Sequence, residues 1–206
     1  MASSRKPSSA DVRAALGRVL AELEGKSVLV ALSGGVDSVV LLHAMREVQG
    51  VRAAHIHHGL SLNAERWARF CRALCRRLGV PLSVRRVRVA PKGEGLEAAA
   101  RAARYAALRK LDFDVLVLAH QLDDQAETVL LKLLRGAGPR GASGMAPRAP
   151  FEGRLLLRPL LEVPREAIVA YAHEHELQWV EDESNHSEAY SRNFIRLRIA
   201  PLLDQR

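Results

Sequence analysis

The clearest chemical signal lies in residues 33–38, which read SGGVDS. The continuous apolar run just before them, 28–32, is typical of a strand covered on both faces, and a helix is expected to follow. Two glycines at such a junction let backbone N–H groups approach an anion, which the N-terminus of the helix also attracts. The segment therefore predicts a phosphate-binding loop.

This loop differs from a Walker loop, which carries a lysine next to a serine or threonine to contact the β and γ phosphates. The lysine is missing here, and a carboxylate, Asp37, lies in the loop instead. A bare carboxylate would repel a triphosphate. We therefore expect Asp37 either to hold Mg2+ against the phosphates or to cap the helix.

A second acidic group follows the apolar run 114–119. Asp123 and Asp124 stand at the expected start of a helix, and Glu127 comes one turn after Asp123. An acidic pair at a helix N-terminus often only compensates the helix dipole. Its place at the same predicted sheet edge as the glycine loop favours a metal and substrate site, with His120 as a candidate for orienting it.

Apolar periodicity places strands and helices in alternation around these segments. We expect strands at 28–32, 51–56, 84–89 and 114–119, and helices at 12–23, 39–45, 63–79, 94–111, 123–134, 164–177 and 187–199. Ser8, Ser9 or Asp11 is the expected cap of the first helix. A glycine- and proline-rich stretch, 136–153, is expected to be a mobile surface loop before an apolar triplet at 155–157. This order predicts an α/β fold: a doubly wound, mostly parallel sheet with a short helical C-terminal extension.

In such a sheet, ligands bind beyond the carboxyl ends of the strands. That rule brings together the loops 33–38, 57–60 and 120–124. The length of 206 residues suits a single domain over 10–206, with its helical extension at about 159–206, after a disordered lead-in at 1–9. There is no apolar run long enough for a membrane span and no signal-peptide pattern, so we expect a cytoplasmic protein with no membrane partner.

Charge and cysteine content narrow the possible partners and the possible metal sites. Lys and Arg number 31 against 23 Asp and Glu, a net charge of +8, and most of the cations are arginines. The planar guanidinium matches phosphate, so the excess indicates a nucleic-acid partner, although arginine-rich codon usage would produce the same count. Cys71 and Cys75 are too few for a cluster or zinc site and are expected to be buried thiols. A zinc pair at His55 and His57 is a weaker reading than packing near a nucleotide.

Taken together, these motifs resemble the tRNA(Ile)-lysidine synthetases, a family of PP-loop ATP pyrophosphatases. The resemblance covers nearly all of 28–203. It rests on the segments 33–38, 55–60, 119–128, 135–138, 158–161, 179–185 and 192–196, together with Glu97, Arg101, Arg104 and Tyr105. The phosphate loop alone marks only the superfamily, whereas the acidic motif with the 158–161, 179–185 and 192–196 segments is much more specific.

The resemblance implies a Rossmann-like fold of the PP-loop ATPase type that uses ATP and Mg2+. The implied reaction joins free L-lysine to C2 of the wobble cytidine of a CAU-anticodon tRNA(Ile), through an adenylated cytidine, with release of pyrophosphate and AMP. Members of the family usually continue into C-terminal tRNA-binding domains, which we expect to be absent here. A homodimer is compatible with this reading.

The resemblance also implies roles for single residues. The catalytic residues would be Asp37, Asp123, Asp124 and Arg101; the nucleotide-binding residues Ser33, Gly34, Gly35, Val36, Asp37, Ser38 and His58; the Mg2+ ligands Asp37 and Asp124; the substrate-binding residues Arg104, Glu127 and His120; and the RNA-binding residues Arg192, Asn193 and Arg196. Asp123 and Glu127 are our candidates for accepting the proton of the lysine ε-amine.

Three alternatives remain open at this point. A tRNA thiolation enzyme of the same superfamily would use additional cysteines, and a C-x-x-C pair is absent. A small-molecule adenylating ligase would share the first loop but not the ending motifs. A non-catalytic RNA-binding module would have no need of Asp37, Asp123 and Asp124.

Overall fold

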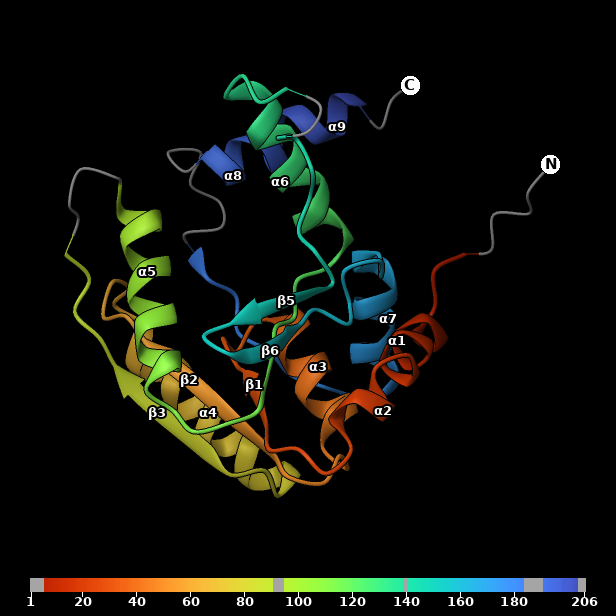
Figure 1. Cartoon of the computed structure of the whole chain (residues 1–206), viewed down its shortest axis with the longest axis vertical. Coiled ribbons are helices and arrows are strands. Elements are labelled where there is room, and N and C mark those ends of the chain that lie inside the picture. The colour runs from red at the N-terminus through yellow and green to blue at the C-terminus, as the bar shows by residue number, and fades with distance from the viewer. Residues whose placement is uncertain (1–5, 91–94, 139–140, 184–190, 204–206) are drawn as a thin grey trace.

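The computed structural model describes residues 6–90, 95–138, 141–183 and 191–203. Within these ranges the strands form a six-stranded sheet of order β3-β2-β1-β4-β6-β5 (Figure 1). The strands are β1 (Val28–Ala31), β2 (Val51–His57), β3 (Leu82–Arg86), β4 (Val115–Val117), β5 (Arg148–Phe151) and β6 (Arg154–Leu157). All neighbours pair in parallel except β5, which runs antiparallel to β6 at the edge. The predicted α/β class is confirmed.

The direction of winding reverses beside β1. The chain moves outward from β1 to β2 and β3, then returns to place β4 on the other side of β1. A reversal of this kind opens a crevice at the carboxyl ends of the two central strands. The loops that follow β1 and β4 are therefore neighbours in space, although about 85 residues separate them in the sequence.

Both central strands are buried on both faces because their side chains alternate between two hydrophobic cores. Val28 and Val30 point into one core and Leu29 into the other. The first core is closed by α1 (Ser9–Gly17), α2 (Leu20–Leu23), α3 (Val36–Met45), α4 (Ala64–Leu78) and α7 (Arg165–Glu174), and the second by α5 (Leu96–Arg109). Helices therefore cover both faces of the sheet, as expected.

The remaining helices lie away from the sheet. α6 (Leu122–Leu134) starts at the carboxyl end of β4 and extends outward, with the C-terminal helices beside it (Figure 1). These are α8 (Ser191–Phe194), a π-helix (Ile195–Ile199) and α9 (Ala200–Leu203). The helix expected at 187–199 is thus interrupted by a wider turn, and its residues 187–190 lie outside the described ranges.

Three other expectations need correction. The stretch 136–153 is not all loop, because β5 lies within it; Pro150 concealed the strand, which tolerates proline as an edge strand. The helix expected to carry residues 12–23 is two helices. The N-cap of the first is Ser8, one of the three expected candidates, so this helix begins at Ser9, inside the expected lead-in 1–9. Residues 1–5 of that lead-in lie outside the described residues. The third strand ends at Arg86, before the expected limit of 89.

The cysteines lie as expected. Cys71 and Cys75 are both buried on the inner face of α4 as free thiols. Burial raises the pKa of Cys71 to about 12 and that of Cys75 to about 11, so neither is a thiolate near neutral pH. None of the helices in the described ranges is both long enough and apolar enough to cross a membrane.

The end of α4 offers a test of the backbone. Gly79 closes this helix with φ +68, a left-handed conformation, and an added Cβ would meet no atom within 4 Å. Gly79→Ala should therefore lower the free energy of unfolding by about 1 kcal/mol through backbone strain alone. Gly17→Ala in α1 is the control: its Cβ also meets nothing, but its backbone is not left-handed. Denaturant titration that shows equal losses for both variants would contradict the conformational explanation.

Candidate active site

The phosphate loop lies at the carboxyl end of β1 and leads directly into α3. Gly35 is the N-cap residue and has no side chain to accept hydrogen bonds from the first turn. The N–H groups of Val36, Asp37 and Ser38 form that first turn, where an α-helix has no internal acceptors. This arrangement suits an anion, as the sequence predicts.

Hydrogen bonds within the loop hold its shape. The Ser38 hydroxyl accepts from the N–H groups of Ser33 (3.2 Å) and Gly34 (3.1 Å) and donates to the Gly35 carbonyl (2.9 Å). The Ser33 hydroxyl accepts from the Gly35 N–H at 3.2 Å. Both serines, expected as nucleotide ligands, brace the loop in this conformation.

A segment from far along the chain fixes the other side of the loop. The Val180 N–H donates to the Gly34 carbonyl at 3.0 Å. Gly34 has φ +99, and a Cβ there would lie 2.9 Å from the Val180 side chain and 3.3 Å from the Cys71 sulfur. Only glycine fits this position. The sequence showed the glycine but not the partner that requires it.

Asp37 points its carboxylate into a partly buried position. Its Oδ1 is buried and has no hydrogen-bond partner among the described residues, while its Oδ2 lies 3.7 Å from Nη1 of Arg165. Burial raises the pKa of Asp37 to about 6; Arg165 opposes the rise, and the charges of Asp124 and Asp123 add to it. These carboxylates therefore share one electrostatic environment. Sequence reasoning missed Arg165, the first residue of α7, because nothing in its local pattern marks it.

Asp124 has two roles at the start of α6. Its Oδ2 accepts from the N–H of Gln121, the N-cap residue, at 3.0 Å, and the Gln121 side chain accepts from the Asp123 N–H at 2.7 Å. Asp124 therefore takes part in capping α6, which is the alternative role expected for an acidic residue at a helix N-terminus. Its Oδ1 lies 4.0 Å from Nη2 of Arg196. Burial raises the pKa of Asp123, which makes it a better proton acceptor than an exposed aspartate.

Glu127 is the most deeply buried carboxylate of the group, with 3% of its surface exposed. Its Oε1 accepts from Nε of Arg196 at 2.6 Å, and its Oε2 is buried without a hydrogen-bond partner in the described part of the chain. Burial raises the pKa of Glu127, and the Arg196 guanidinium limits that rise.

The residues expected to contact RNA lie beside this acidic group. Arg196 pairs with Glu127, as above, and Arg192 donates to the Thr128 hydroxyl at 3.0 Å and faces Glu97 at 3.7 Å. Asn193 is buried. In this conformation both guanidinium groups lie next to carboxylates of the protein, and their contact with RNA stays a prediction.

His58, His120 and Arg104 form a second polar group, in which Arg104 lies near both imidazoles. Burial lowers the pKa of His58 to about 4 and that of His120 to about 3, so both imidazoles are neutral near pH 7, and it also lowers the pKa of Arg104. Each of the three has a buried ring or guanidinium nitrogen without a hydrogen-bond partner in the ranges described. Arg101 stacks over Tyr105 at 5.0 Å. These unpaired nitrogens are suited to a polar ligand.

The histidines of β2 are held by protein groups. A ring nitrogen of His55 lies 2.9 Å from the Leu32 carbonyl, and His57 Nε2 lies 3.3 Å from Glu65. Within the described ranges, no three His, Cys, Asp or Glu side chains form a group that could enclose a metal. Mg2+ needs only one or two protein carboxylates when phosphates and water complete its shell, and the unpartnered Oδ1 of Asp37 with nearby Asp124 fits that requirement.

Comparison with known proteins places this geometry in a wider group. A family model described as a PP-loop domain matches residues 8–203. Proteins named tRNA(Ile)-lysidine synthase from Salmonella schwarzengrund and Salmonella dublin are 52% and 53% identical over 192 residues. Those matches cover 89% of this chain and 45% of each relative, so the chain spans about half the length of the curated relatives it matches.

Solved structures share the fold. The U34-tRNA thiolase NcsA from Methanococcus maripaludis superposes with a TM-score of 0.75 at 20% identity, covering 96% of this chain and 72% of that one. The NH3-dependent NAD synthetase from Campylobacter jejuni gives 0.55 at 15% identity, with 96% and 84% covered. At these identities the likeness supports the fold alone.

The Glu127–Arg196 pair yields a stability prediction. Arg196→Met should lower the free energy of unfolding by about 2–3 kcal/mol because it leaves a buried carboxylate uncompensated. Adding Glu127→Gln should restore most of that loss. Arg148→Met, which breaks the exposed pair with Glu22, is the control and should cost less than about 1 kcal/mol. Additive losses in the Glu127/Arg196 double variant would show that the two side chains do not stabilise each other.

Proposed function

The chain belongs to the PP-loop domain family, and from this membership we propose that it is the catalytic domain of a tRNA(Ile)-lysidine synthase. It would use ATP and L-lysine to convert the wobble cytidine of a CAU-anticodon tRNA(Ile) to lysidine. The observation that carries the proposal is the meeting of the phosphate loop with Asp37, Asp123, Asp124 and Glu127 at one sheet edge. The 52–53% identity to the Salmonella synthases supports the choice of substrate.

The chemistry explains why a phosphate loop is needed. The C2 carbonyl of cytidine is a poor electrophile, and its oxygen is a poor leaving group. Attack of that oxygen on the α-phosphorus of ATP forms a C–O–P bond and releases pyrophosphate. The lysine ε-amine then attacks C2, the C–O bond breaks, AMP leaves and the amine loses its proton. Charge that develops on the phosphates must be stabilised in both steps.

The loop would bind the pyrophosphate portion. The first-turn N–H groups of α3 point along the helix axis, and Gly35, where a Cβ would meet only the Ser33 hydroxyl, would let the phosphates approach the backbone. Gly34 would contribute through its backbone. Asp37 and Asp124 would hold Mg2+, which when bound neutralises phosphate charge. The neutral ring of His58 lies near Arg104, where it would contact the nucleotide without adding charge.

The acidic group would receive the lysine. A lysine ε-amine has a pKa of about 10.4 in water and must lose a proton before it attacks. Asp123 and Glu127 have raised pKa values and are the candidate acceptors. Arg101 and Arg104, across the cleft, would contact the α-phosphate of the activated base or the lysine carboxylate, with His120 orienting the site.

The RNA must present its base outside a stack to reach this cleft, which suits a single-stranded anticodon loop. Arg192 and Arg196 would exchange carboxylate partners for RNA phosphates at its mouth. Activity in the cytoplasm and a homodimeric state remain predictions of this reading. The thiolation alternative is weaker, because the buried thiols Cys71 and Cys75 are protonated at neutral pH.

Replacement of Asp37 tests its part in the chemistry. Asp37→Asn should reduce pyrophosphate release in the presence of tRNA, ATP and Mg2+ by at least about 100-fold, since it removes a charged ligand for the phosphate-bound cation. Affinity for tRNA should change less than twofold. Asp114→Asn, a matched change of an exposed aspartate at the opposite end of β4, is the control. Near-normal turnover of the Asp37 variant would remove Asp37 from the mechanism.

A reconstitution separates the candidate functions. The chain is mixed with ATP, Mg2+, labelled lysine and CAU-anticodon tRNA(Ile), and both pyrophosphate and labelled RNA are measured. Lysidine synthesis predicts that both appear and that neither forms without tRNA. Pyrophosphate without label in RNA would favour another adenylating ligase, and no pyrophosphate with tRNA bound would favour an RNA-binding module.

A further inference from the structure

The outer face of α4 is the most strongly charged helix surface in the described structure. It exposes the five arginines Arg66, Arg69, Arg72, Arg76 and Arg77. At 100° per residue they occupy one arc, opposite the buried side chains of Ala68, Cys71 and Leu74. From the first arginine to the last this stripe is about 17 Å long, at about 1.5 Å per residue.

The stripe has little opposing charge. Within the described ranges, none of the five arginines forms an ion pair with a carboxylate. The one acidic residue of α4, Glu65, is engaged by Arg86 and His57. On the neighbouring edge strand β3, Arg86 lies on the α4 side and pairs with Glu65, so this acidic side chain is already neutralised. A helix face kept in water would ordinarily mix charges of both signs, so this one is suited to a polyanion.

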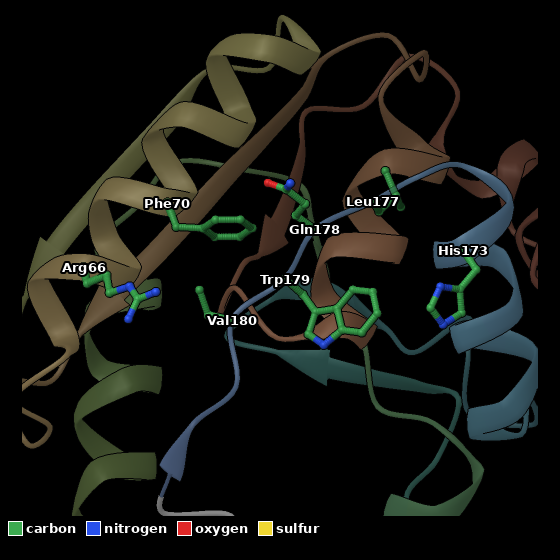
Figure 2. Close-up of a pocket in the computed structure, with 7 residues that line it drawn as sticks. All are labelled: Arg66, Phe70, His173, Leu177, Gln178, Trp179 and Val180. Carbon is green, nitrogen blue, oxygen red and sulfur yellow. The ribbon is translucent and has the colours of Figure 1, made fainter.

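A groove runs along the inner side of the stripe (Figure 2). It has a volume of about 500 Å3 and is lined by Arg66, Phe70, His173, Leu177, Gln178, Trp179 and Val180. Phe70 projects from α4 toward the 177–180 segment, and the ring of Trp179 lies on the α7 side of that segment, 5.8 Å from the ring of His173. Arg66 stands at one end. Aromatic faces next to a guanidinium can stack an unpaired base and hold its phosphate.

The arginine stripe and the groove consist of other residues than the candidate active site, but they adjoin it. α4 begins at the carboxyl end of β2, so Arg66 lies at the same sheet edge as the phosphate loop, and the stripe leads away from that edge. Val180 forms part of the groove and also donates to the Gly34 carbonyl. An RNA with one base in the cleft could therefore continue along α4.

We propose that the arginine stripe and the groove together form a second RNA-binding surface, which holds the backbone of the substrate tRNA with one unpaired base in the groove that Phe70 and Trp179 line. The proposal rests on the proposed function for the identity of the RNA. Arginine rather than lysine along the stripe favours phosphate, which the planar guanidinium binds with two hydrogen bonds. Aromatic side chains beside that stripe favour nucleic acid over an acidic protein.

The first experiment measures tRNA affinity of the full chain from 50 to 300 mM salt. The triple variant Arg69→Gln, Arg72→Gln, Arg76→Gln should bind about tenfold or more weakly at physiological salt. Its plot of log affinity against log salt should be less steep by about 2 to 3, because each lost phosphate contact removes about 0.7 to 0.9. ATP binding should be unchanged in this variant.

A matched control removes the same charge elsewhere. The triple variant Arg18→Gln, Arg109→Gln, Arg148→Gln replaces exposed arginines that pair with glutamates outside the stripe. It should retain the wild-type salt slope within about 1. Equal losses in both variants would show that net charge alone attracts the RNA, and would overturn the proposal, as would unchanged binding of the stripe variant or no tRNA binding by the wild-type chain.

The second experiment reports on the groove. Trp67→Phe leaves Trp179 as the single tryptophan, and a uridylate octamer is added to this variant. Stacking should quench the fluorescence, and Phe70→Leu in the same background should weaken that quenching by at least threefold. Absence of quenching while the octamer binds would exclude the groove.

The two proposals fail in different ways. If the wild-type chain transfers lysine to tRNA but the stripe variant binds tRNA normally, the second surface is wrong and the proposed function stands. If the stripe variant loses tRNA binding but the wild-type chain never forms lysidine, the surface stands and the proposed function is wrong.

Discussion

A concentration of negative charge at one sheet edge is the constraint on which the rest of the site depends. Asp37, Asp123, Asp124 and Glu127 converge where burial makes ionisation unfavourable, and burial raises the pKa of three of them. Such a group persists only if cations or hydrogen-bond donors balance it. The chain supplies part of that balance through Arg165 and Arg196. We infer that a cation bound between these carboxylates and the phosphates of the nucleotide supplies the rest during the reaction.

The fold brings the carboxylates together through a reversal of winding. β1 and β4 are neighbours in the sheet, so the loop before α3 and the start of α6 face each other across one crevice. The Val180 contact holds the loop from outside, because only a glycine at position 34 leaves room for it. Loop position is thus fixed by packing before any ligand binds, which reduces the entropy lost on binding.

Much of this could be read from residue patterns, and the limits have physical causes. Because β1 and β4 are buried on both faces, they appear in the sequence as continuous apolar runs. Asp37 and Asp124 come shortly after these two runs. The sequence did not predict β5, because an edge strand needs neither a long apolar run nor the N–H that Pro150 lacks. The roles of Arg165 and Val180 were not predicted, because they depend on tertiary neighbours that leave no local sequence pattern. The inward orientation of Arg196 could not be predicted either, since helical spacing does not say which face packs.

The most direct test of the central claim is to measure, by calorimetry and without tRNA, how Mg2+ changes the affinity of the chain for ATP. If buried carboxylates hold the cation against the phosphates, Mg2+ should tighten ATP binding to the wild-type chain by at least about tenfold. The same titration with Asp37→Asn should show almost no effect of Mg2+ while weak binding to the loop persists. Equal enhancement by Mg2+ in both proteins would contradict the claim that these carboxylates and the phosphate loop act as one site.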